Sequence, residues 1–145
     1  MLSRSLKDTV NFAKKLANEI FLKPRKKALV LALVGELGTG KTTFVKAFAK
    51  TLGIKRRITS PTFLIMRKYF IGSRIHAYSP RLRFGEAGRQ AGEDRRSKYR
   101  ILYHIDVYRI KSVKDLKVLG FEEILNNKEN LILIEWADKI KNILP

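Results

Sequence analysis

The sequence contains no cysteine, which excludes disulfide bridges and thiolate metal sites. Only two histidines occur, His76 and His104, so a histidine-based metal site is not expected. The 13 acidic residues stand against 31 lysines and arginines, which gives a formal net charge of +18. A surface this basic attracts polyanions such as RNA, DNA and nucleotide phosphates. A lysine-rich proteome is the alternative explanation, because net charge reports on association and not on fold.

Long hydrophobic runs are also missing. The longest apolar run spans residues 28–34, far short of the roughly 18 residues that cross a membrane. Residues 1–5 lead into a charged helical pattern instead of the apolar segment of a secretory signal. We therefore expect a cytoplasmic protein without membrane contact. With 145 residues, 45% of them hydrophobic, the chain can form one domain with a real core.

The first part of the chain predicts a helix, a strand, a loop and a second helix. Apolar residues recur at helical spacing over 5–21, after a Ser-Leu-Lys-Asp start that resembles a capping box. Residues 28–34 form a short continuous apolar run, which suits a strand buried on both faces. A glycine-rich loop over 35–40 precedes a helix over 41–52, and Gly53 is a suitable helix stop.

The second part predicts three further strands and two short helices. The strands are expected over 62–69, 101–110 and 131–134. A short helix is expected over 113–119, followed by a turn at Gly120 and a further helical turn through Leu125. Strands that alternate with helices indicate an α/β fold with a central, mostly parallel sheet flanked by helices. We expect a single domain over 1–145.

Residues 72–100 interrupt this pattern. The segment is polar, rich in arginine and glycine, and only weakly periodic. So long a loop without regular structure is uncommon inside a compact domain. We interpret 72–100 as a mobile basic insertion.

The strongest motif is Gly-Glu-Leu-Gly-Thr-Gly-Lys-Thr at residues 35–42, which matches the phosphate-binding P-loop. Its glycines let the backbone turn and direct N–H groups at phosphate oxygens, and the following helix adds its positive N-terminal end. In such a loop, Lys41 reaches the β- and γ-phosphates and the Thr42 hydroxyl coordinates Mg²⁺. Because an apolar strand precedes the loop and a helix follows it, the sequence predicts a P-loop NTPase fold.

Two acidic residues sit where strands should end and could serve the metal and the attacking water. Glu135 follows the apolar run 131–134, as a Walker B acid does, although an ordinary strand-end glutamate is the alternative. Asp106 would share one strand face with His104 and Tyr108, and a salt-bridged structural role is its alternative. For His104 we favour an orienting hydrogen bond over a role as catalytic base.

Three further features are each open to more than one interpretation. The hydroxyls of Thr59-Ser60-Pro61-Thr62 could close on the γ-phosphate as switch segments do, or form a plain turn. Trp136 could pack against the site or face a partner, or belong to the core. Arg109 could neutralise phosphate charge or pair with a nearby acid.

Taken together, five motifs resemble the TsaE (YjeE) family of small bacterial ATPases. They are the P-loop with Thr43, Ser-Pro-Thr-Phe at 60–63, His-Ile-Asp-Val-Tyr-Arg at 104–109, Leu-Gly-Phe at 119–121, and Ile-Glu-Trp at 134–136. Members of that family are required for making threonylcarbamoyladenosine in tRNA. The resemblance implies that this chain binds ATP, ADP and Mg²⁺ and hydrolyses ATP together with TsaB and TsaD, with tRNA reached through that complex.

The resemblance also implies roles for the matching residues. The nucleotide-binding set is Gly35, Glu36, Leu37, Gly38, Thr39, Gly40, Lys41, Thr42, Thr43, Ser60 and Thr62. The catalytic set is Lys41, Asp106 and Glu135, and the metal set is Thr42, Asp106 and Glu135.

The chain departs from the family pattern in two places. The family joins the strands at 62–69 and 101–110 by a short turn, whereas this chain carries the 72–100 insertion. Family members usually add a strand pair after Glu-Trp, and without it we expect an unpaired sheet edge.

Two other functions stay open at this stage. A small P-loop kinase would need a lid of phosphate-clamping arginines, which the insertion could supply. An RNA-binding module with a structural nucleotide could use the insertion and Lys55-Arg56-Arg57. A GTPase is disfavoured, because Asn127-Lys128-Glu129-Asn130 lacks the aspartate that would recognise guanine.

Overall fold

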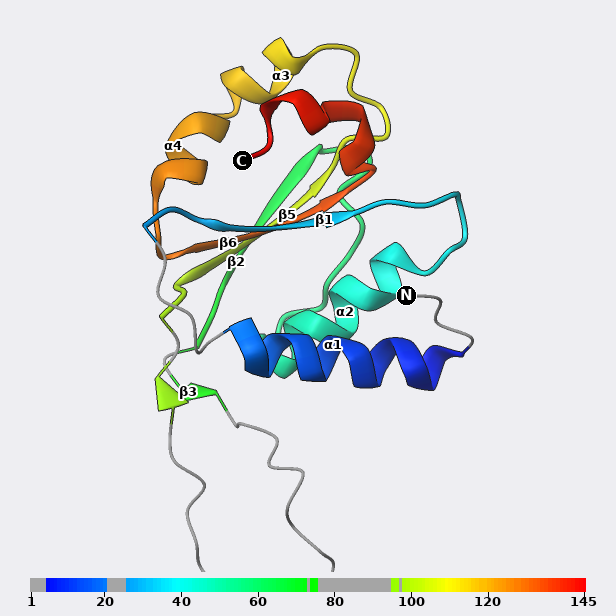
Figure 1. The fold of residues 1–145 in the computed structure, drawn as a ribbon, viewed down its shortest axis with the longest axis vertical. Coiled ribbons are helices and arrows are strands. Elements are labelled where there is room, and N and C mark those ends of the chain that lie inside the picture. The colour runs from blue at the N-terminus through cyan, green and yellow to red at the C-terminus, as the bar shows by residue number, and fades with distance from the viewer. Residues whose placement is uncertain (1–4, 21–25, 73, 76–94, 97) are drawn as a thin grey trace, which may run out of the picture.

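A four-stranded sheet forms the centre of the molecule in the computed structural model (Figure 1), which describes residues 5–20, 26–72, 74–75, 95–96 and 98–145. The strand order is β1-β6-β5-β2, with β1 at Leu29–Leu33, β6 at Asn130–Glu135, β5 at Ile101–Asp106 and β2 at Met66–Phe70. β1, β6 and β5 run parallel, and β2 is antiparallel to β5. The predicted mostly parallel α/β sheet is confirmed.

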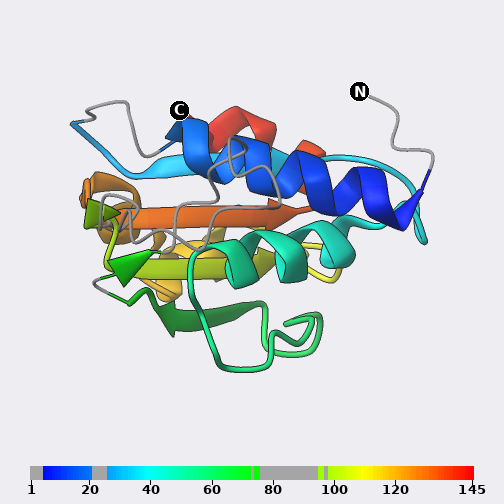
Figure 2. The same cartoon turned by 90° about the horizontal axis from the view of Figure 1, so that it is seen from below.

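Helices cover both faces of this sheet (Figure 2). α1 (Leu6–Ile20) and α2 (Lys41–Thr51) lie on one face, and α3 (Val113–Val118), α4 (Phe121–Asn126) and the 3₁₀ segment η1 (Ala137–Ile143) lie on the other. Alternate residues of β6 serve the two sides: Leu131 and Leu133 join the core beneath α1 and α2, and Ile132 and Ile134 join the opposite core. All six residues of β6 are buried, as expected for a central parallel strand.

The predicted helix starts are borne out by local hydrogen bonds. The Ser5 hydroxyl accepts from the backbone N–H of Asp8, which is the capping contact expected for the first helix. α2 begins directly after Gly40, and the helix stop at Gly53 has a positive φ of 74°. Within the described residues, no helix has both the length and the apolar character that a membrane crossing requires.

Two strand predictions were wrong at one end. The strand predicted over 62–69 starts only at Met66, because Leu64 N–H donates to the Pro61 carbonyl and Ile65 adopts a left-handed φ of 63°. The strand predicted over 101–110 ends at Asp106, whose carboxylate accepts from the backbone N–H of Tyr108 and turns the chain.

The segment 72–100 contains regular structure at both ends. Two short strands, β3 (Arg74–Ile75) and β4 (Arg95–Arg96), pair antiparallel. Tyr99 is buried in the core beneath α1 and α2, so the segment returns to the domain before β5 begins. Residues 76–94 lie outside the described part of the chain, and the mobility of the insertion stays a prediction.

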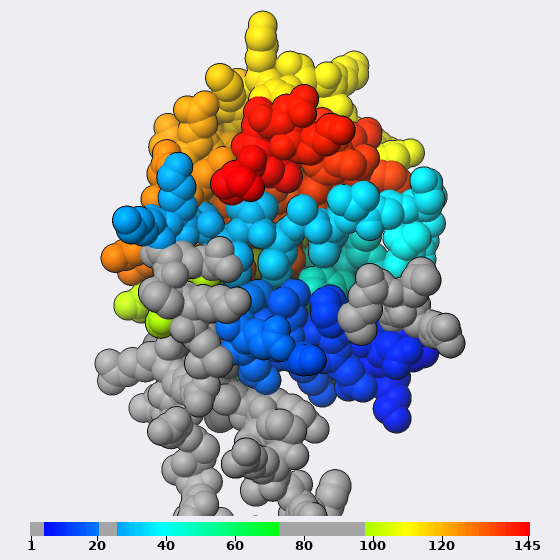
Figure 3. Space-filling model, in the orientation of Figure 1, coloured from blue at the N-terminus to red at the C-terminus, as the bar shows by residue number. Residues whose placement is uncertain are grey.

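β1 lies at an edge of the sheet. Among the described strands it pairs only with β6. Figure 3 shows residues of β1 at the surface, between α1 and the C-terminal residues. Every open sheet has two edge strands, so this edge does not test the prediction about a further strand pair.

Candidate active site

A glycine-rich turn joins β1 to α2 and opens the candidate site. Gly38 and Gly40 have φ values of 80° and 87°, a conformation that side-chain-bearing residues rarely adopt. A Cβ added to either residue would meet no atom within 4 Å, so backbone conformation and not space requires glycine here. Gly40 is the N-cap of α2, and its carbonyl accepts the helix's first bond from Phe44. The loop therefore brings backbone N–H groups and a helix N-terminus to one place, as an anion site needs.

Lys41 lies across this turn. Its Nζ donates to the carbonyl oxygens of Gly35, at 2.6 Å, and Glu36, at 2.8 Å. The same Nζ lies 4.0 Å from the centre of the Trp136 ring, a cation–π distance. Gly35 and Glu36, predicted to bind nucleotide, thus act on the lysine through their carbonyls and do not line the pocket.

Two carboxylates meet this turn at the ends of the neighbouring strands β5 and β6. Asp106 and Glu135 are register partners, and each is only 3% exposed. The Thr42 hydroxyl oxygen lies 2.9 and 3.0 Å from the two Glu135 carboxylate oxygens. Its single O–H therefore makes a bifurcated hydrogen bond to both oxygens. The parallel strands place both acids at the carboxyl end of the sheet, where open α/β sheets bind their ligands.

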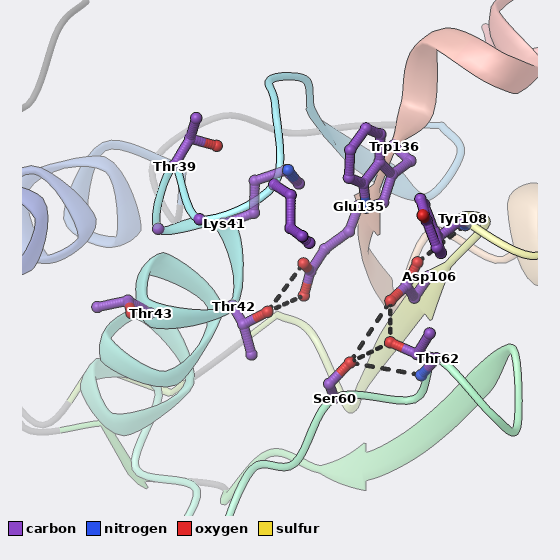
Figure 4. Close-up of a pocket in the computed structure, with 13 residues that line it drawn as sticks. Thr39, Lys41, Thr42, Thr43, Ser60, Thr62, Asp106, Tyr108, Glu135 and Trp136 are labelled. Carbon is purple, nitrogen blue, oxygen red and sulfur yellow. Dashed lines mark hydrogen bonds between the residues drawn. The ribbon is translucent and has the colours of Figure 1, made fainter.

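Hydroxyls of the 59–62 loop complete the acidic side of the site (Figure 4). The Thr62 hydroxyl donates to Asp106 Oδ2, and Ser60 Oγ lies 2.6 Å from Thr62 Oγ1. Ser60 also reaches the same Asp106 oxygen at 3.4 Å. The loop is therefore attached to the site through Asp106, and its closure on a γ-phosphate stays a prediction.

His104 lies behind Glu135 and is completely buried. Its Nε2 lies 2.8 Å from Glu135 Oε1, while its Nδ1 has no hydrogen-bond partner among the described residues. His104 can donate one hydrogen bond from Nε2 to the Glu135 carboxylate, which orients that carboxylate. The orienting hydrogen bond predicted for His104 is therefore present.

These residues surround one pocket of about 370 Å³, a size typical of small-molecule sites. Its lining consists of Leu37, Gly38, Thr39, Gly40, Lys41, Thr42, Thr43, Ser60, Thr62, Asp106, Tyr108, Glu135 and Trp136. The structure thus brings eleven of the predicted site residues together and adds Tyr108 and Trp136.

Comparisons with known proteins show the family of this chain. The sequence model for "Threonylcarbamoyl adenosine biosynthesis protein TsaE" matches residues 3–87 and 91–145. The chain belongs to the TsaE family. The tRNA threonylcarbamoyladenosine biosynthesis protein TsaE of Rickettsia prowazekii is 38% identical over 141 residues, which cover 97% of this chain and 75% of that protein. The Bacillus subtilis TsaE is 37% identical over 116 residues, 80% of this chain and 55% of that protein.

A solved structure carries the same fold. The crystal structure of YdiB from Bacillus subtilis superposes with a TM-score of 0.61 and 30% sequence identity, over 99% of this chain and 67% of that one. The fold is therefore the P-loop fold of a TsaE family member, and the family acts in tRNA threonylcarbamoyladenosine biosynthesis.

Tyr108 and Trp136 line the pocket of this TsaE chain without belonging to the predicted site sets, although a place against the site is one of the interpretations of Trp136. Trp136 has a positive φ of 61°, which turns the chain directly after β6 and sets the indole beside Lys41. Tyr108 packs against it, with ring centres 5.0 Å apart. Trp136 both lines the pocket and packs against the core cluster that contains Leu116 and Phe121. A non-glycine left-handed residue gives no sequence signal of its own.

Arg109 forms no ion pair with an acid in the described part of the chain, and its role in neutralising phosphate charge stays a prediction. Its guanidinium lies 4.3 Å from the centre of the Phe63 ring, a side chain that is 81% exposed. The pair lies on the 59–64 side of the site, and Arg109 is not among the residues that line the pocket.

The donor set of this TsaE site fits Mg²⁺ bound together with a phosphate. Thr42, Asp106 and Glu135 offer only oxygen atoms, which Mg²⁺ prefers. Among the described residues, no group of three or more histidine, cysteine or acidic side chains could hold an ion unaided. Magnesium usually binds through one or two carboxylates plus substrate phosphates, so phosphate oxygens would have to complete its coordination here.

Proposed function

We propose that this chain binds ATP with Mg²⁺ and hydrolyses it, in the cytoplasm, for tRNA threonylcarbamoyladenosine synthesis, acting with TsaB and TsaD. In this proposal tRNA is reached through that complex. The single observation that carries the proposal is the contact between Thr42 and Glu135, because it joins a phosphate-binding turn to a buried acid within one pocket.

Phosphate binding would use the turn and the helix that follows it. The backbone N–H groups of residues 38–42 and the N-terminus of α2 supply positive potential without a mobile side chain. Lys41 adds a full charge, and its Nζ can turn from the two loop carbonyls to the β- and γ-phosphates. Trp136 would hold the lysine stem on the pocket side during this exchange.

Hydrolysis would depend on the acidic side of the pocket. When bound, Mg²⁺ neutralises charge that develops on the β- and γ-phosphate oxygens. Thr42 and the two carboxylates would hold it. Glu135 would also orient the attacking water, and His104 fixes the carboxylate in place from behind. Ser60 and Thr62 would hold Asp106 while their loop follows the γ-phosphate.

Turnover by the isolated chain should be slow. Among the described residues, no arginine lines the pocket. An arginine that neutralises transition-state charge accelerates related hydrolases by about 10³–10⁵. A partner protein is the natural source of such a charge in this proposal.

The orienting role of His104 gives a prediction that separates binding from turnover. We expect His104→Phe to lower kcat about tenfold or more, because Glu135 then loses its buried donor. Nucleotide affinity should stay within about twofold, since the lysine side of the pocket is untouched. His104→Gln, which can still donate near the Nε2 position, is the matched control and should retain more turnover. Equal kcat for His104→Phe and the parent chain would contradict the role.

The proposed function itself is tested by ATP turnover with Mg²⁺, measured alone and with TsaB, TsaD and tRNA. We expect stimulation of about tenfold or more by the partners. Turnover that is unchanged by partners and tRNA would contradict the proposal. Transfer of the γ-phosphate to a small molecule in a cell extract would instead favour the kinase.

A further inference from the structure

Arg67 lies beside His104 in the sheet, one strand further from Glu135. The antiparallel register of β2 and β5 sets Arg67 directly opposite His104. Side chains directly opposite each other in an antiparallel pair share one face, with Cβ atoms about 4.5–5.5 Å apart. The pair two positions along, Tyr69 with Leu102, belongs to the core beneath α1 and α2. Because side chains alternate along a strand, Arg67 and His104 lie on that same face.

Both residues of this pair carry a buried polar atom without a partner. Among the described residues, three buried side-chain nitrogen or oxygen atoms have no hydrogen-bond partner: Arg67 Nε, His104 Nδ1 and Asn130 Oδ1. Two of the three therefore belong to side chains that lie opposite each other. Leaving a buried polar atom unpaired is costly, and buried polar groups in folded proteins nearly always find a partner.

The two atoms are chemically complementary. The Nε–H of arginine is a donor and cannot accept. His104 Nε2 lies 2.8 Å from Glu135 Oε1, and an imidazole that carries its proton on Nε2 has an acceptor at Nδ1. One contact between Arg67 and His104, direct or through a single water, would therefore satisfy both atoms.

The described residues offer Arg67 no other polar partner. Its side chain is half-buried on the edge strand β2 and forms no ion pair with an acid in the described part of the chain. The two carboxylates of the site are already hydrogen-bonded elsewhere, Asp106 to Thr62 and Glu135 to Thr42. His104 Nδ1 is thus the neighbouring acceptor that no other group uses.

We propose that Arg67 is a positioning residue whose Nε–H donates to His104 Nδ1, directly or through one water. This contact keeps the His104 proton on Nε2, where it holds the Glu135 carboxylate. The hydrogen bonds then form a row from the edge strand β2 through His104 and Glu135 to Thr42 at the start of α2, and Figure 4 shows the last contact of that row. The effect of Arg67 on turnover rests on the proposed hydrolysis, whereas its contact with His104 does not.

Two substitutions separate the Nε–H from the rest of the arginine side chain. Arg67→Met keeps an unbranched stem without a donor, and Arg67→Gln places an amide N–H at the same position along the side chain without the charge. We expect Arg67→Met to lower kcat about three- to tenfold, the effect of one hydrogen bond, with ATP-analogue affinity within about twofold of the parent. Arg67→Gln should retain most of the parental kcat. Lys68→Met removes an equal charge from the opposite face of β2 and should match the parent chain.

A second measurement reports on His104 itself and needs no turnover. The chain has two histidines, so ¹⁵N-histidine labelling gives two sets of ring-nitrogen resonances, which the variant His76→Gln assigns. We expect His104 of the parent chain to carry its proton on Nε2 and to accept a hydrogen bond at Nδ1. The Nδ1 resonance should shift in Arg67→Met and stay near its parental position in Arg67→Gln. A side chain that only packs against its neighbours would not produce this difference.

Several results would overturn the proposal. They are an unchanged Nδ1 resonance in Arg67→Met, a His104 proton found on Nδ1 in the parent chain, parental kcat in Arg67→Met, or equal losses of kcat in Arg67→Met and Arg67→Gln. If the parent chain hydrolyses no ATP at all, the proposed function fails, and the resonances of His104 still decide whether Arg67 contacts it.

Discussion

Lys41→Ala is expected to abolish detectable ATP binding. The substitution removes the full positive charge of the phosphate-binding turn. The Lys41 Nζ already donates hydrogen bonds to the carbonyl oxygens of Gly35 and Glu36 in that turn. Two charge-assisted hydrogen bonds contribute about 1.5–3 kcal/mol each, so affinity should fall at least about a hundredfold. Titration with a fluorescent ATP analogue in Mg²⁺ measures the loss.

Lys46→Ala is the control for this change. Lys46 lies on the same helix, α2, and is exposed, so its loss alters net charge equally without touching the pocket. Its affinity should match that of the parent chain within about twofold. Retention of ATP affinity by Lys41→Ala would contradict the assignment of this turn as the phosphate site.

Glu135→Gln should keep ATP binding and lose turnover. The amide retains the size of the side chain and an oxygen that can accept from Thr42, but it cannot act as a base or hold a metal as well as a carboxylate can. Loss of a positioned base costs about 10²–10⁴ in rate. Single-turnover phosphate release, measured beside analogue binding, separates the two effects.

Glu129→Gln serves as the comparison for Glu135→Gln. Glu129 precedes β6 and is exposed at the opposite end of the strand from Glu135. We therefore expect the Glu129→Gln variant to bind ATP and to hydrolyse it as the parent chain does. Glu135→Ala should show the same separation of binding from turnover, with an added loss of stability, because it leaves His104 and Thr42 without their buried partner. Parental turnover in either Glu135 variant would remove this residue from the catalytic role.

The phosphate-binding turn could be predicted from sequence because all of its determinants are local. The apolar strand, the glycines and the helix start follow one another within residues 28–52, and the structure confirms each element. Predicting that Asp106 lies close to Glu135 required an argument about the tertiary fold, since 29 positions separate the two residues in the sequence. This closeness could be anticipated only because parallel neighbouring strands end at the same edge of a sheet.

The parts that could not be predicted depend on tertiary contacts of single residues. Thr62 and Phe63 have strand propensity, yet the hydroxyl of Thr62 bonds to Asp106 and a turn closes at Leu64. Tyr99 seemed part of a polar insertion, but it fills the core beneath α1 and α2. Hydrophobic periodicity does not reveal such contacts, because one buried residue forms no repeating pattern. η1 was not anticipated either, and it begins where Trp136 reverses the chain.

The register between β5 and β6 limits where this protein can change length. Successive side chains of a strand alternate between faces, so one extra residue between Ile101 and Asp106 would move that carboxylate to the α3 and α4 face of the sheet. Additions between β2 and β5 leave the pairing of Phe70 with Ile101 intact, and the long segment of this chain lies there. Insertions and deletions among related sequences should therefore collect at that connection and avoid the six positions of β5.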